Sequence, residues 1–87
     1  DQQRAGNPFF LYYTSVIPHT NNELGRDTGN GQEVPEDAPY GAKPWPQVEK
    51  NFAAMVSLLD RQVASLIDKL KQKGLYDNTL IVFTSDN

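Results

Sequence analysis

The chain has 87 residues, of which 38% are hydrophobic and 22% are charged, an ordinary composition for a globular protein. Eight basic and 11 acidic residues give a net charge of -3, which argues against a nucleic-acid-binding surface. Cysteine is absent, so disulfides, thiolate metal sites and a cysteine nucleophile are excluded within these residues. No apolar run is long enough to span a membrane. Because so short a chain buries little surface, we expect residues 1–87 to be an internal fragment of a larger domain.

The first predicted element is a strand at residues 8–17, which is rich in aromatic and β-branched side chains and is bounded by Pro8 and Pro18. Residues 20–45 follow and contain Gly, Pro, Asn and Asp throughout, without a sustained period, so they predict a long loop. A loop of this length inside a compact domain is usually either functional or disordered.

The next predicted element is a helix at residues 46–74. Its apolar side chains recur at steps of three and four residues and form one stripe: Val48, Phe52, Met55, Val56, Leu59, Val63, Leu66, Ile67 and Leu70. Pro46 suits the first helical turn, and Gly74 provides the left-handed residue that ends many helices. The last element is a strand at residues 79–85, where an unbroken apolar run is typical of a strand covered on both faces.

The order of elements predicts an α/β fold, a strand–long loop–helix–strand crossover unit with parallel strands. Parallel strands end at the same edge of a sheet, which is where ligands bind in such folds. His19 follows the first predicted strand, and Asp86 and Asn87 follow the second. Carboxylate and amide oxygens are the donors that Ca²⁺ and Mg²⁺ prefer. A lone histidine after a strand is, however, often only an exposed loop residue, and Asp-Asn is often only a turn.

Four stretches of the sequence resemble the sulfatase family of the alkaline phosphatase superfamily. They are residues 7–13 (Asn-Pro-Phe-Phe-Leu-Tyr-Tyr), residues 17–23 (Ile-Pro-His-Thr-Asn-Asn-Glu), residues 45–60 and residues 70–87. The most specific parts are the Pro-His pair after the aromatic run and the final Asn-Thr-Leu-Ile-Val-Phe-Thr-Ser-Asp-Asn. Residues 25–43 add nothing to the resemblance.

The resemblance implies a sulfuric ester hydrolase (an arylsulfatase-like enzyme) with an alkaline-phosphatase-like sandwich fold and a sulfate ester substrate. By the same resemblance, Asp86 and Asn87 are metal ligands to Ca²⁺, with Mg²⁺ the less expected ion, and His19 is the catalytic histidine that contacts the sulfate. The family's members are periplasmic, secreted or lysosomal, whereas the segment itself does not indicate a compartment. The formylglycine nucleophile of the family arises from a Cys/Ser-x-Pro-x-Arg motif, which does not occur here.

Because that motif is missing, we expect the nucleophile outside this segment and expect the segment alone to be inactive. Two alternatives stay open on the sequence. One is a phosphoester or phosphonate hydrolase of the same superfamily, and the other is a non-catalytic α/β interaction module. A two-strand, one-helix unit leaves apolar faces without cover, so we also expect the isolated fragment to self-associate.

Overall fold

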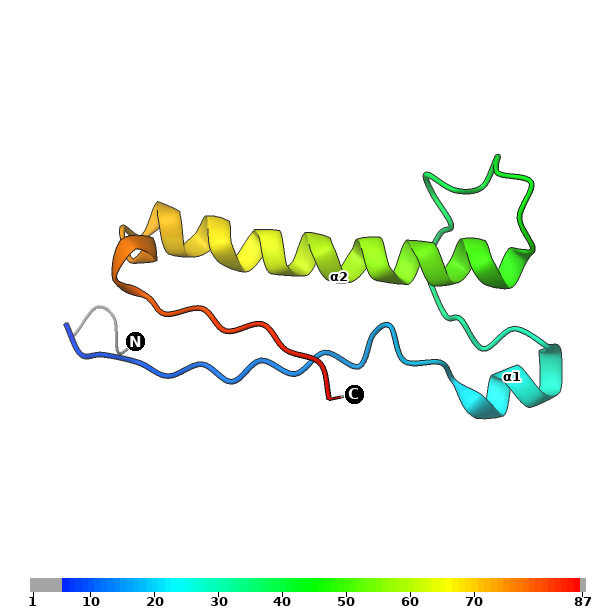
Figure 1. Cartoon of the computed structure of the whole chain (residues 1–87), viewed down its shortest axis with the longest axis horizontal. Coiled ribbons are helices and arrows are strands. Elements are labelled where there is room, and N and C mark those ends of the chain that lie inside the picture. Colours follow the sequence, from blue (N-terminus) through cyan, green and yellow to red (C-terminus); the bar gives the residue numbers. More distant parts are fainter. Residues whose placement is uncertain (1–5, 87) are drawn as a thin grey trace.

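The computed structural model describes residues 6–86, which form an elongated body of 50 × 27 × 22 Å (Figure 1). Its helices are α1 (Asn22–Thr28), α2 (Gln47–Gln72) and the short 3₁₀ helix η1 (Tyr76–Asn78). The radius of gyration is 17.0 Å, whereas a compact domain of this length has a radius of about 12 Å. The described residues therefore spread along one long helix rather than close around a core of their own.

Helix α2 lies inside the range 46–74 that the apolar stripe predicts, and both of its ends follow from local sequence. Pro46 is the N-cap, and its carbonyl accepts a hydrogen bond from the Glu49 N–H at 3.0 Å. At the other end Gly74 has φ 67°, the Leu75 N–H donates to the Leu70 carbonyl at 2.9 Å, and the Gly74 N–H donates to Lys71 at 3.0 Å. This pattern is a Schellman motif, which pairs the last carbonyls of the helix.

The buried apolar side chains among the described residues are those of Ala54 and Met55, both in α2. The remaining apolar stripe of α2 is half-buried or exposed. The hydrophobic contribution to stability grows with the apolar area removed from water. A core of two residues therefore provides little stability, and the fold rests mainly on α2 and on the segments that contact it.

The predicted strands at residues 8–17 and 79–85 are wrong: residues 6–86 contain no strand, so the strand–helix–strand crossover with a parallel sheet is not formed. Both segments run as irregular, extended chain, and no backbone hydrogen bond joins them. The sequence pattern indicates that these side chains favour burial, but a β-sheet also needs a neighbouring strand in the right register. A sheet of only two strands is marginally stable in water. Phe10 and Leu80 are accordingly 90% exposed.

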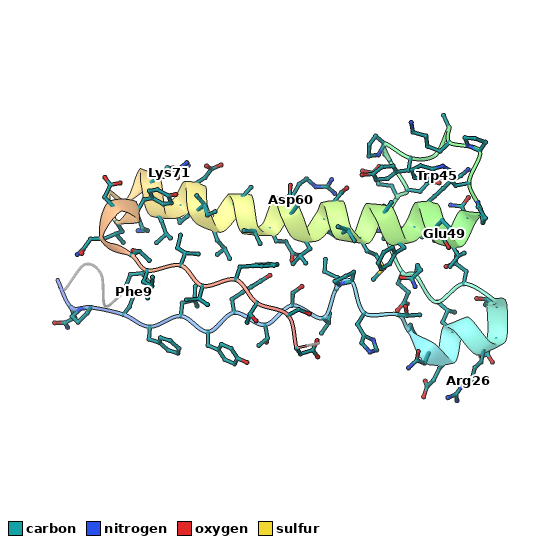
Figure 2. All side chains as sticks on the ribbon, in the orientation of Figure 1. Phe9, Arg26, Trp45, Glu49, Asp60 and Lys71 are labelled. Atoms are coloured by element: carbon teal, nitrogen blue, oxygen red, sulfur yellow. The ribbon has the colours of Figure 1, made fainter. Side chains whose placement is uncertain are left out.

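The two extended segments nevertheless run in the same direction along α2 (Figure 1). Figure 2 shows Phe9, early in the first segment, at the end of α2 that carries Lys71, whereas Trp45 and Glu49 mark the other end. The first segment contacts the helix where the Tyr13 hydroxyl donates to Gln62 Oε1 at 3.2 Å. The second segment contacts it where Phe83 lines a hollow with three apolar residues of the helix, Val56, Leu59 and Val63.

Helix α1 lies within the stretch 20–45, for which the sequence predicts only a loop. Its ends are nevertheless encoded in the sequence. The Asn21 Oδ1 accepts a hydrogen bond from the Leu24 N–H at 3.0 Å, and Gly29, with φ 77°, follows the last turn. With seven residues and none of them buried, α1 has no apolar face that a periodic pattern could reveal.

Candidate functional site

His19 follows the first extended segment and lies just before α1. Its backbone N–H donates to the Val16 carbonyl at 2.9 Å across a turn at Ile17 and Pro18, whose peptide bond is cis. The residue is exposed. The imidazole is thus open to a ligand, while the backbone that carries it is held by a hydrogen bond.

Asp86 ends the second extended segment and is also exposed. Within residues 6–86 its carboxylate has no hydrogen-bond or ion-pair partner, so its oxygens are available to a cation. Asn87, the other predicted metal ligand, lies outside the described residues.

His19 and Asp86 both lie past the end of a segment that runs toward the N-terminal part of α2 (Figure 1). No hydrogen bond joins these two residues in the described part of the chain. The two segments that precede these residues therefore run in the same direction, but the described residues do not bring His19 and Asp86 together into one site.

The described residues contain no cluster of three or more His, Cys, Asp or Glu side chains that could hold a metal. The donors at the end of the second segment still fit a hard cation in kind, because they are an exposed carboxylate in Asp86 and a side-chain amide in Asn87, the next residue of the sequence. Calcium takes about six to eight oxygen ligands. Any cation held here would therefore need most of its ligands from residues other than Asp86 and Asn87.

A set of hydrogen bonds holds the chain directly after His19 against the turn at residues 30–33. The Asn21 backbone N–H donates to the Gly31 carbonyl at 2.9 Å, and the Asn21 Nδ2 donates to Glu33 Oε2, also at 2.9 Å. The Asn21 carbonyl accepts from the Gly25 N–H inside α1. Asn21 thus joins the segment that carries His19 to both α1 and the 30–33 turn.

Gln32 connects the same region to α2. Its Nε2 donates to the Thr20 Oγ1 at 2.5 Å, and its backbone carbonyl accepts from Asn51 Nδ2 of α2 at 3.0 Å. We refer to the contacts Asn21–Gly31, Thr20–Gln32 and Gln32–Asn51 as the histidine clamp.

Gly31 is buried at the centre of the histidine clamp. A Cβ atom at this position would lie 2.7 Å from Thr20 Cγ2 and would press against the carbonyl oxygen of Asn21. Those contacts are closer than side chains normally allow, and the second one is with backbone. Glycine is therefore required here by the close approach of two chain segments.

The histidine clamp was not predicted from the sequence. Its contacts join residues 10, 12 and 19 positions apart, and no local pattern specifies such pairs. One feature does point to it: Asn51 stands between Val48 and Met55 at steps of three and four residues, so a polar side chain interrupts the apolar stripe of α2. A polar residue at such a position usually has a hydrogen-bond partner, as Asn51 does.

No described helix is both long and apolar enough to cross a membrane. Among solved structures, none matches the chain. A profile of the sulfatase family, in contrast, matches residues 1–87, the whole sequence.

Curated relatives agree with the family match. The chain is 34% identical over 80 residues to the uncharacterized sulfatase YdeN of Escherichia coli (strain K12), covering 92% of this chain and 13% of that protein. It is 43% identical over 54 residues to an arylsulfatase of Klebsiella aerogenes, covering 62% of this chain and 11% of that protein. It is 32% identical over 87 residues to human arylsulfatase A, covering 100% of this chain and 14% of that protein. The chain thus spans a small part of these relatives' length, and it belongs to the sulfatase family.

Proposed function

We propose that residues 1–87 are one segment of a longer enzyme that hydrolyses sulfate esters, a sulfuric ester hydrolase. The observation that carries the proposal is the family match over the whole chain. The arylsulfatases among the relatives support a sulfate ester as the substrate. Because the chain has no Cys/Ser-x-Pro-x-Arg motif, the nucleophile comes from outside this segment, as a formylglycine.

In this proposal His19 contacts the sulfate group of the substrate. An exposed imidazole on a backbone held by hydrogen bonds suits that task, because the imidazole carries at least one ring N–H, whether neutral or protonated, that can donate a hydrogen bond to a sulfate oxygen. The same ring can also move a proton to or from the ester oxygen as a general acid or base.

Asp86 and Asn87 bind a divalent cation, Ca²⁺ in preference to Mg²⁺, through their side-chain oxygens. When bound, such a cation neutralises negative charge on the sulfate oxygens. Support comes from the carboxylate of Asp86, which is exposed and has no partner within residues 6–86, and from the side-chain oxygens that Asp and Asn provide at this end of the chain. Ca²⁺ tolerates the irregular, oxygen-rich coordination that ligands drawn from several segments provide, whereas Mg²⁺ demands a near-ideal octahedron.

The proposal is tested with the full-length protein and p-nitrophenyl sulfate, with p-nitrophenyl phosphate as the competing substrate. We expect His19→Ala to lower kcat/KM for the sulfate ester by about 10²–10⁴, the usual contribution of a positioned acid–base group. Asp27→Ala is the matched control, because Asp27 is an exposed polar residue of the neighbouring α1. Faster hydrolysis of the phosphate ester by the wild type would favour a phosphoester hydrolase, and full activity of His19→Ala would remove His19 from the site.

A further inference from the structure

We propose that Gln32 is a positioning residue for His19 and that it acts through Thr20, the residue next to the histidine. The inference rests on the proposed function, in which His19 contacts the sulfate. It assigns to the histidine clamp a task beyond holding the loop together: Gln32 couples the position of the imidazole to helix α2.

The first step of the argument is that Gln32 is fixed at three of its polar groups. Its backbone N–H donates to Asn30 Oδ1 at 3.0 Å, and its backbone carbonyl accepts from Asn51 Nδ2 at 3.0 Å. Its side-chain Nε2 donates to the Thr20 hydroxyl at 2.5 Å. Because the backbone of Gln32 is held at both its N–H and its carbonyl, its side chain starts from a fixed position and can hold the Thr20 hydroxyl in place.

The second step is that Gln32 is itself hydrogen-bonded to the long helix α2, through Asn51. Asn51 belongs to α2, and its Oδ1 accepts a hydrogen bond from Gln47 Nε2 one turn earlier at 2.9 Å. The same Gln47 Nε2 also lies 2.9 Å from Asp37 Oδ2. A continuous path of hydrogen bonds therefore runs from the first two turns of α2 through Asn51 and Gln32 to Thr20.

The third step concerns what holds His19 itself. Its imidazole is exposed and has no side-chain hydrogen bond among the described residues, so no neighbouring group orients the ring directly. The backbone is held before the ring by the bond from the His19 N–H to Val16 and, two residues later, by the bond from the Asn21 N–H to Gly31. The side chain of Thr20, the residue next to the histidine, is held by Gln32. Misplacement of a reacting group by about 1 Å can lower a rate about 10²-fold. Among the described residues, the bond from Gln32 to Thr20 is the side-chain hydrogen bond nearest to His19 in sequence, and we assign to it the control of the imidazole position.

The partial burial of Gln32 supports a positioning task. Its Oε1 is buried and finds no partner among the described residues. A buried polar atom without a hydrogen bond is costly, and such an atom in a folded protein calls for an explanation. An apolar side chain of the same size would avoid that cost but would lose the bond to Thr20, and retention of that bond explains the glutamine.

The test is a double-mutant cycle in the full-length protein, with kcat and KM measured separately for p-nitrophenyl sulfate. Gln32→Leu keeps the size of the side chain and removes the bond to Thr20. We expect it to lower kcat about 10–100-fold, as is usual when a residue that orients a functional group is replaced, and to change KM less than about twofold. In the His19→Ala background the same substitution should change kcat by less than about twofold, because there is no imidazole left to position.

Gln62→Leu is the matched control, because Gln62 is a glutamine of α2 that accepts a hydrogen bond from Tyr13, away from the histidine clamp. It should leave kcat within about twofold of the wild type. An equal loss from Gln32→Leu with and without His19 would show that Gln32 is merely structural and would overturn the inference. The inference would also be overturned if Gln32→Leu kept the wild-type kcat while His19→Ala was inactive. Wild-type turnover by His19→Ala would instead defeat the proposed function at that residue.

A second pair of variants removes the same bond from its other end, in case Gln32→Leu does not fold. Thr20→Val loses the hydroxyl that accepts from Gln32, whereas Thr20→Ser keeps it. We expect Thr20→Val to reproduce the loss of kcat and Thr20→Ser to retain most of the wild-type value. Equal activity of the two variants would contradict the proposed path through Thr20.

Discussion

Gly31→Ala is the substitution for which the structure predicts the clearest effect. The added Cβ would lie 2.7 Å from Thr20 Cγ2 and 3.1 Å from the Asn21 carbonyl carbon, whereas ordinary contact begins at 3.4 Å. The methyl of Thr20 would have to retreat by about 0.7 Å, and the Asn21 carbonyl, which already accepts from the Gly25 N–H, cannot retreat without moving the backbone. The segment just after His19 is therefore displaced.

The magnitude follows from two terms. Overpacking of this kind costs about 1–3 kcal/mol, and loss of the Asn21–Gly31 backbone bond costs about 0.5–1.5 kcal/mol. We expect the free energy of unfolding of the full-length protein to fall by about 1.5–4.5 kcal/mol in denaturant titration. Sulfatase activity per folded molecule should fall as well, because the displaced segment carries His19.

Gly25→Ala is the control for this prediction. Its Cβ would meet the same Gly31 at 3.6 and 3.7 Å, which is ordinary contact. Alanine inside a helix is favoured over glycine by about 0.5–1 kcal/mol, so this variant should be as stable as the wild type or slightly more stable. If Gly31→Ala unfolds at the same denaturant concentration as Gly25→Ala and keeps full activity, the close packing of the histidine clamp is refuted.

The other predictions concern the proposed metal ligands and the isolated segment. In the full-length protein, Asp86→Ala or Asn87→Ala should abolish most sulfatase activity, whereas Asp68→Ala, an exposed carboxylate of α2, should not; wild-type turnover in both ligand variants would remove them from the site. The isolated chain should bind Ca²⁺ poorly, since two residues cannot supply the roughly six to eight oxygens the ion takes; micromolar binding by calorimetry would contradict this. The isolated chain should also self-associate or be partly unfolded, because Phe10, Leu80 and Val82 are strongly exposed; a monodisperse monomer in light scattering with one sharp melting transition would contradict this.

Helix α2 could be predicted from the sequence because its determinants are local. The apolar stripe sets its face, Pro46 sets its beginning and Gly74 sets its end, and each lies within the helix or directly beside it. Helix α1 could not be predicted by the same reasoning, because a seven-residue helix with no buried side chain shows no apolar period. Only its caps, Asn21 and Gly29, are visible in the sequence.

The strand predictions failed for a different physical reason. A continuous apolar run indicates that side chains favour burial, but a strand is defined by hydrogen bonds to a neighbour. Residues 8–17 and 79–85 form no such bonds with each other, and their side chains are turned toward α2 or left exposed. The histidine clamp escaped prediction because its hydrogen bonds join residues far apart in sequence. His19 and Asp86 could be selected because each follows an extended segment, whereas their roles remain predictions.

The most direct measurement is a crystal structure of the full-length protein with Ca²⁺ and a bound sulfate ester or sulfate. The account predicts oxygens of Asp86 and Asn87 at about 2.3–2.6 Å from the ion. It also predicts a ring nitrogen of His19 at about 2.7–3.2 Å from a sulfate oxygen, with Gln32 bonded to Thr20 behind it. A structure with ion and sulfate held by other residues, and with His19 and Asp86 both facing solvent, would contradict it.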